Sequence, residues 1–117
     1  MIDTATGPVP DPTVLVQAQL DAYNAHDLRA FTACYADDAQ VLDAEGRVLR
    51  DGIEEIRVGY GQRFASPDLH AELVGRLHVG PWVFDHERVT GVADEPVNVV
   101  VGYFVRDGRI AIARMHQ

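Results

Sequence analysis

Three segments in the first half of the chain carry apolar residues at helical spacing. The first follows Asp11-Pro12, an N-cap residue and a first-turn proline, and is predicted to run to about residue 25. The second begins near Asp27, and the third begins at residues 51–54, whose spacing is that of a capping box. The predicted apolar faces are Val16, Leu20 and Tyr23, then Leu28, Phe31 and Tyr35, then Ile53, Ile56, Tyr60 and Phe64.

The second half of the chain has the pattern of strands. Gly80-Pro81, residues 91–96 and the hairpin pair Asp107-Gly108 divide it into four segments. A short strand is also predicted at 39–43. Three helices around one short strand, followed by an antiparallel meander, predict an α+β fold with helices on one face of a curved sheet. We expect one domain over residues 12–117, preceded by a flexible tail at 1–11. The four predicted strands span 69–79, 82–90, 97–105 and 109–116.

Composition excludes several classes of function. A net charge of −8 disfavours binding to nucleic acid or to an anionic membrane. No apolar run approaches the roughly 20 residues of a membrane span, and the first residues lack the pattern of a secretory signal, so we expect a cytoplasmic protein. The lone Cys34 cannot form an intramolecular disulfide and is interpreted as a core residue. No motif for a phosphate, a metal or another cofactor is present, so none is predicted.

Two stretches resemble a known superfamily. The first runs from Leu20-Asp21-Ala22-Tyr23-Asn24 through Tyr35-Ala36-Asp37-Asp38-Ala39, and the second is Asp51-Gly52-Ile53-Glu54-Glu55-Ile56. They are similar to the nuclear-transport-factor-2-like (NTF2-like) superfamily, which includes ketosteroid isomerases, SnoaL-type polyketide cyclases, scytalone dehydratase and limonene epoxide hydrolase. The resemblance covers residues 13–116. It implies a cone-shaped, cystatin-like α+β barrel with one interior pocket in a SnoaL-like bacterial protein.

The resemblance carries over few of the isomerase residues. Asp43 falls at the position of the family's general base. Gln19 stands where the isomerases have an oxyanion-hole tyrosine, and Val101 stands where they have a neutral aspartic acid. Because the dienolate oxygen needs those two donors, steroid isomerisation of that form is not expected.

The strand at 82–90 supplies the remaining candidate chemistry. Alternation places Trp82, Phe84, His86 and Arg88 on one face and the intervening residues on the other, without deciding which face lines the pocket. The resemblance implies that His86 and Arg88 point inward, where they would meet Asp43. A carboxylate beside an imidazole or a guanidinium is a plausible acid–base site. The alternatives are a buried structural network, or an outward position at a dimer contact.

The predicted ligand is a small, largely apolar molecule. Two classes of function stay open: a cofactor-independent isomerase, dehydratase, cyclase or hydrolase using Asp43, His86 and Arg88, or a non-catalytic binding or dimerisation module. A homodimer through the sheet is expected from the resemblance, and from the apolar character of residues 97–105 on both faces. The predicted pocket wall consists of Tyr23, Tyr60, Phe64, Trp82, Phe84, Val101, Tyr103 and Met115.

Overall fold

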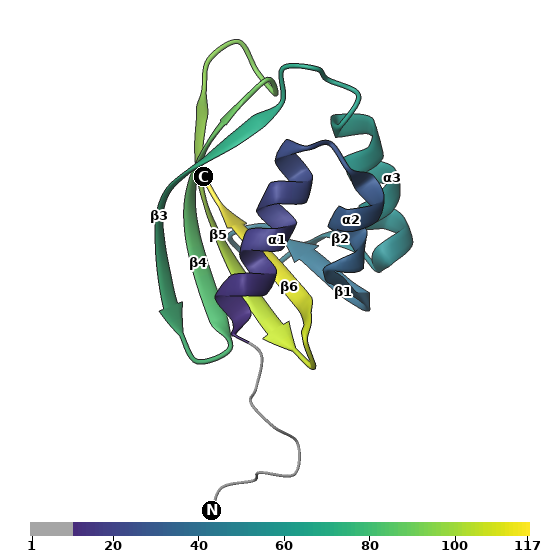
Figure 1. The fold of residues 1–117 in the computed structure, drawn as a ribbon, viewed down its shortest axis with the longest axis vertical. Helices are drawn as coiled ribbons and strands as arrows, with labels where there is room; N and C mark the ends of the chain where they lie inside the picture. The colour runs from purple at the N-terminus through teal and green to yellow at the C-terminus, as the bar shows by residue number, and fades with distance from the viewer. Residues whose placement is uncertain (1–10) are drawn as a thin grey trace, which may run out of the picture.

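A computed structural model describes residues 11–117; the tail predicted at 1–11 therefore lies, apart from Asp11, outside the described residues. Three helices lie on one side of a curved, six-stranded sheet (Figure 1). This arrangement confirms the predicted α+β fold. The helices are α1 (Pro12–Asn24), α2 (Leu28–Ala33) and α3 (Ile53–Arg63), and the strands are β1 (Tyr35–Leu42), β2 (Val48–Asp51), β3 (His70–Val79), β4 (Trp82–Thr90), β5 (Val97–Arg106) and β6 (Arg109–His116).

The strands are ordered β2-β1-β6-β5-β4-β3, and the last four form the predicted antiparallel meander. The pair β1–β6 is parallel, so the sheet is mixed. In the register of β4 with β5, Asp85 lies opposite Val101 and Val83 lies opposite Tyr103. A bulge at Phe104/Val105 then places Met115 opposite Val101. Directly opposed residues share a face, so Val101, Tyr103 and Met115 fix the inner face of this part of the sheet.

The helix caps explain where the elements begin. Asp11 accepts a hydrogen bond from the Thr13 N–H at 2.9 Å, and Asp27 accepts one from the Ala30 N–H at 3.0 Å. The capping box predicted at 51–54 is wrong. Gly52, with φ 91°, is the N-cap and has no side chain to donate or accept, while Glu55 accepts from the Asp51 N–H at 2.7 Å.

The second helix is shorter than predicted. It ends at Ala33, and Tyr35 begins strand β1 instead of completing the helical face. Four aromatic rings from the three helices pack together with centroid separations from 4.7 to 6.3 Å and form the centre of the core. The four rings belong to Tyr23, Phe31, Tyr60 and Phe64.

No helix within residues 11–117 is long and apolar enough to cross a bilayer.

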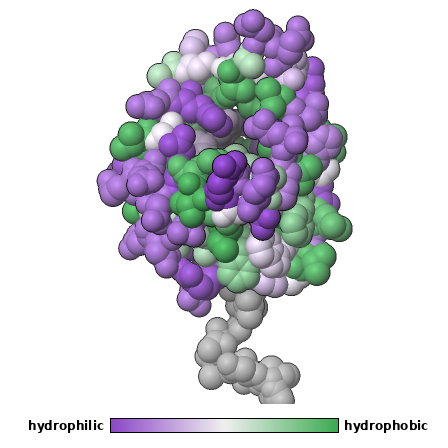
Figure 2. All heavy atoms as spheres, turned by 180° about the vertical axis from the view of Figure 1, so that it is seen from behind, coloured by the Kyte–Doolittle hydropathy of each residue, from purple (hydrophilic) through white to green (hydrophobic). Residues whose placement is uncertain are grey.

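The outer face of the sheet carries an apolar patch. Leu77 lies opposite Phe84, and Val79 lies opposite Trp82, which in turn lies opposite Phe104. Leu77 and Val79 are about 60% exposed. Seen from the side opposite to that in Figure 1, apolar side chains form patches among polar ones (Figure 2). We refer below to these five residues as the outer patch.

The loop between β4 and β5 is anchored at Gly91. Its carbonyl accepts a hydrogen bond from the Ser66 hydroxyl at 3.1 Å. Its φ of 87° lies in the left-handed region, and a Cβ there would come within 2.5 Å of the Asp68 backbone. Only glycine satisfies both conditions, so the loop is held against the connection between α3 and β3.

Candidate functional site

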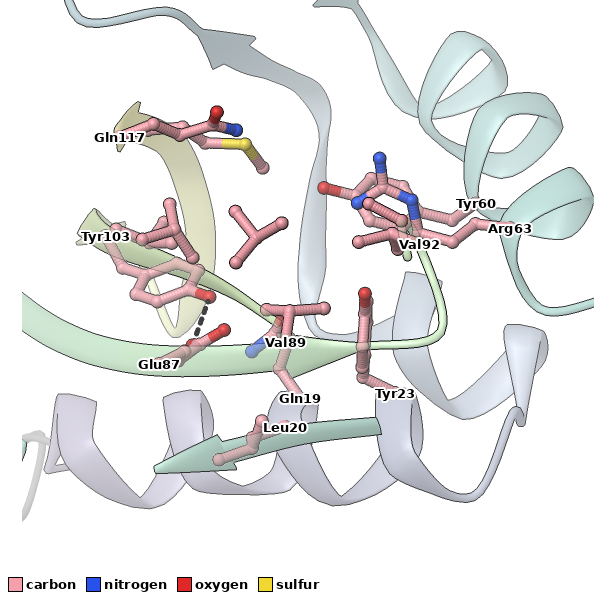
Figure 3. Close-up of a pocket in the computed structure, with 15 residues that line it drawn as sticks. Gln19, Leu20, Tyr23, Tyr60, Arg63, Glu87, Val89, Val92, Tyr103 and Gln117 are labelled. Atoms are coloured by element: carbon pink, nitrogen blue, oxygen red, sulfur yellow. Dashed lines mark hydrogen bonds between the residues drawn. The ribbon is translucent and has the colours of Figure 1, made fainter. Parts of the chain in front are cut away.

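A cavity of about 230 Å³ lies between the inner face of the sheet and helices α1 and α3. An apolar cavity of about 150 Å³ holds benzene, so this one has room for a single ring with a short substituent. The view in Figure 3 shows side chains from the sheet, both helices and the β4–β5 loop converging on one space. Its lining consists of Gln19, Leu20, Tyr23, Tyr60, Arg63, Glu87, Val89, Val92, Ala93, Val97, Val99, Val101, Tyr103, Met115 and Gln117.

Within residues 11–117, Glu87 is the one residue on the cavity wall with a carboxyl side chain. It projects from the inner face of β4, its residue is 6% exposed, and its Oε2 accepts a hydrogen bond from the Tyr103 hydroxyl at 3.3 Å (Figure 3). Burial raises the pKa of Glu87 to about 7, and the negative charge of Asp85 adds to this effect. The hydrogen bond from Tyr103 and the charge of Arg76 oppose the rise. A carboxyl with this pKa exchanges a proton readily near neutral pH.

A buried ion pair lies next to Glu87 on the inner face. Asp85 is fully buried and accepts two hydrogen bonds from Arg76, at 2.7 Å from Nε and 2.9 Å from Nη2. Arg76 Nη1 donates to Gln17 on α1 at 3.0 Å. These bonds to Asp85 raise the pKa of Arg76. The bidentate pair neutralises one buried carboxylate and leaves Glu87 without a cation of its own.

Two further groups of polar side chains reach the cavity. On one side, Gln19 accepts a hydrogen bond from the fully buried Tyr35 hydroxyl at 3.1 Å. On the other side, Tyr23 and Tyr60 lie beside Arg63, whose guanidinium carbon is 5.6 Å from the Tyr60 ring centroid. Burial raises the pKa of Tyr60 to about 12 against the opposing charge of Arg63, so both phenols are neutral hydrogen-bond donors.

The structure brings five of the eight predicted wall residues to the cavity and places three elsewhere. Phe64 packs in the aromatic core, with its ring 5.4 Å from that of Tyr23. Trp82 and Phe84 stack on each other on the outer face, so predicting them as pocket wall was wrong. The five residues on the cavity wall are Tyr23, Tyr60, Val101, Tyr103 and Met115.

The three residues predicted to converge do not meet. His86 and Arg88 lie on the outer face, where His86 Nε2 is 3.0 Å from Asn98 Oδ1 and Arg88 is exposed. Their predicted inward orientation is wrong because Val83, Asp85, Glu87 and Val89 occupy the inner face. Asp43 follows β1 in a surface turn, where its Oδ2 pairs with Arg47 Nε at 2.9 Å. The backbone N–H of Arg47 also donates to its carboxylate, and this bond lowers the pKa of Asp43. It does not line the cavity.

Sequence reasoning missed Glu87, Gln19 and Arg63 as site residues. For Glu87 a signal existed, because Val83 and Val89 share its face and mark it as a buried face. Trp82 and Phe84 make the opposite face equally apolar, so the alternation of residues in this strand did not decide which face points inward. Among the residues described, no group of three or more His, Cys, Asp or Glu is placed to hold a metal ion.

Comparison with known proteins identifies the family. A cystatin-fold protein from Novosphingobium aromaticivorans is 29% identical with a TM-score of 0.86, over 93% of this chain and 100% of that one. A Sinorhizobium meliloti protein that bears a polyketide cyclase name is 25% identical, with a TM-score of 0.78 over 92% and 95% of the two chains.

An NTF2-like protein from Cytophaga hutchinsonii shares the fold at 13% identity, with a TM-score of 0.79 over 94% and 92% of the two chains. A comparison with proteins of curated function finds no match. The family model of the SnoaL-like domain matches residues 16–113, which is most of the chain. With the cone-shaped fold and its interior cavity, this match shows that the chain belongs to the SnoaL-like domain family.

Proposed function

We propose that the protein is a cofactor-independent enzyme that moves a proton on a small, largely apolar molecule, with Glu87 as the general acid–base. The observation that carries this proposal is the position of the Glu87 carboxyl, which opens into a cavity with mostly aliphatic and aromatic walls. Proton transfer of this kind underlies isomerisation, dehydration and cyclisation. Asp43, His86 and Arg88 have no part in it, because none of them reaches the cavity.

The neighbours of Glu87 suit this role. The Tyr103 hydroxyl holds one carboxylate oxygen and leaves the other, Oε1, without a partner among the described residues. That oxygen is free to remove a proton from a carbon atom of the ligand. The neutral hydroxyls of Tyr23 and Tyr60 are available to donate to an oxygen on which negative charge develops.

The proposal is tested by following exchange of the α-protons of small cyclic ketones, such as cyclohexanone, for deuterium in D₂O by NMR. Removal of an α-proton is the step that Glu87 would catalyse, so exchange needs no knowledge of the natural substrate. We expect Glu87→Gln to slow the protein-catalysed exchange by about 10²-fold or more. Asp43→Asn and Arg88→Ala serve as controls and should leave the rate unchanged.

Exchange that is unaffected by Glu87→Gln would contradict the role of this residue. Binding of the ketones without any exchange would instead favour the non-catalytic binding module. Bound ketone raises the melting temperature in either case, so thermal shift separates a ligand that binds without reacting from one that does not bind.

We also propose that two copies of the chain pair through the outer patch. The patch is apolar across three adjacent strands, and exposed contiguous apolar surface of this kind is typical of interfaces. Leu77→Arg should give a monomer in sedimentation, while Val58→Arg, at an equally exposed position on α3, should not. A wild-type chain that sediments as a monomer would contradict the pairing.

A further inference from the structure

The cavity carries one cationic group whose role the proton transfer leaves unassigned. We propose, building on the proposed function, that the natural ligand is a small carboxylate, with its apolar body in the cavity and its anionic group bound by Arg63 at the mouth. Arg63 would hold the ligand at one end, and Glu87 would act on it at the other.

Local packing fixes the position of Arg63. It is the last residue of α3, and its guanidinium lies over the ring of Tyr60, which projects from the same helix. A side-chain hydrogen bond with Tyr23 engages one N–H of the guanidinium, and the remaining N–H groups of the planar fork match the two oxygens of a carboxylate. Figure 3 shows Arg63 together with Tyr60 and Val92 on the side of the cavity away from Glu87 and Tyr103.

Arg63 has no acidic partner within residues 11–117. Four other arginines there pair with carboxylates, and among them the half-buried Arg76 donates two hydrogen bonds to Asp85. Among the described residues that line the cavity, Arg63 is the one with a cationic side chain, in a chain whose net charge is −8. Arg63 is exposed, lines the cavity and lacks an acidic partner within residues 11–117, and an anionic ligand would supply one.

The two ends of the cavity call for different chemical groups. Glu87 is hydrogen-bonded to Tyr103 deep in the cavity, and its pKa of about 7 means that it is largely uncharged below neutral pH. It therefore does not repel an anion held at the opposite end. Between the two ends the wall is formed by valines and aromatic rings, which suit a ring or a short alkyl chain.

The test compares the affinities of phenylacetate and phenylacetamide, which have the same shape and differ in charge, by calorimetry at about pH 6. We expect the wild-type protein to bind phenylacetate about five- to tenfold more tightly, because a charge-assisted hydrogen bond at a partly exposed site is worth about this factor. Arg63→Gln should remove the preference. Arg29→Gln, which makes the same change of charge at an exposed position on α2, should keep it.

The ratio of the affinities for phenylacetate and phenylacetamide measures the contribution of the ligand's charge, separately from other effects of the Arg63→Gln substitution. Arg63 also lies in the last turn of α3, where a cation stabilises the helix, but loss of that stability would weaken both probes equally. Equal binding of both probes by the wild type, a preference that survives in Arg63→Gln, or no binding of either probe would each overturn the proposal. Glu87→Gln should bind phenylacetate at least as tightly as the wild type, so failure of the catalytic role is distinguished from failure of carboxylate recognition.

Discussion

The two faces of strand β4 differ in what they bury. The inner face carries two valines and two carboxylates, Asp85 and Glu87, all of which are less than 8% exposed. The outer face alternates with it residue by residue and carries Trp82, Phe84 and His86, each partly exposed, and an exposed Arg88. The larger apolar side chains thus lie outside, and the acidic ones lie inside.

This inversion shows that hydrophobicity alone does not choose the face of a strand. Asp85 is acceptable inside because Arg76, directly opposite it on β3, satisfies both of its oxygens. Glu87 is acceptable because it takes up a proton near neutral pH. The aromatic residues are acceptable outside if the outer patch is covered by a second copy of the chain.

The largest effect should follow from breaking the ion pair on the inner face. Arg76→Met leaves Asp85, which is fully buried, as a charge without a partner, and we expect the free energy of unfolding to fall by about 3 to 5 kcal/mol. Urea denaturation measures the change, with Arg88→Ala on the outer face as the control. Replacing both partners, as Asp85→Leu with Arg76→Met, should recover most of the loss; a double variant as unstable as Arg76→Met alone would contradict this explanation.

The next effect concerns the proton on Glu87. Its pKa is raised from 4.5 to about 7 in the folded protein, so folding favours the protonated form, and stability is lost as the pH rises from about 4.5 through about 7. Glu87→Gln should therefore stabilise the protein by up to about 3 kcal/mol at pH 8 and have little effect near pH 4.

Glu72→Gln, on the exposed side of β3, makes the same change of charge and should show no such dependence. Denaturation curves of the three proteins between pH 4 and pH 8 measure the difference. An equal gain at both ends of this range would mean that Glu87 is not protonated by folding.

A smaller effect should appear when the hydroxyl of Tyr103 is removed. Because its hydrogen bond lowers the pKa of Glu87, Tyr103→Phe should move that pKa above about 7. NMR titration of the Glu87 carboxyl carbon measures the pKa directly. A lower pKa in the variant would show that water replaces the hydroxyl and solvates the carboxylate.

The smallest effect is expected on the outer face. His86→Ala removes only its exposed hydrogen bond with Asn98, so stability should change by less than about 0.5 kcal/mol. Deuterium exchange of ketones should also be unchanged. A loss of exchange comparable with that of Glu87→Gln would restore His86 as a candidate site residue.

Much of the fold could be predicted because local signals agreed with one another. The caps at Asp11 and Asp27 and the turns at Gly80-Pro81 and Asp107-Gly108 placed four of the strand and helix starts to the residue. The pattern failed at Tyr35, where the apolar spacing of a helix continued into a strand. Tyr35 would be buried at the end of a helix as well as at the start of a strand. Its apolar character therefore could not show where α2 ends and β1 begins.

The candidate site could be predicted only in part, because it depends on register. Val101 and Tyr103 were predicted to face inward, and their partners on β4 are Asp85 and Val83. A register shifted by one residue would have turned His86 and Arg88 inward instead. The loop at 91–96 is too long to fix that register. The two-residue turn at Gly80-Pro81 does pair Arg76 with Asp85, but it does not decide which face of the hairpin points inward.

The anchor at Gly91 lies between a variable part of the cavity wall, the β4–β5 loop, and a fixed part, the paired strands β4 and β5. Val92 and Ala93 follow this residue and form part of the cavity mouth, while Glu87 and Tyr103 are held by strand pairing. Because the loop is tied down by a glycine outside the cavity, we expect substitutions at its next two positions to alter the width of the entrance without moving Glu87 or Tyr103. We expect related proteins to diverge in ligand size at this loop first, with the same inner wall accommodating ligands of several sizes.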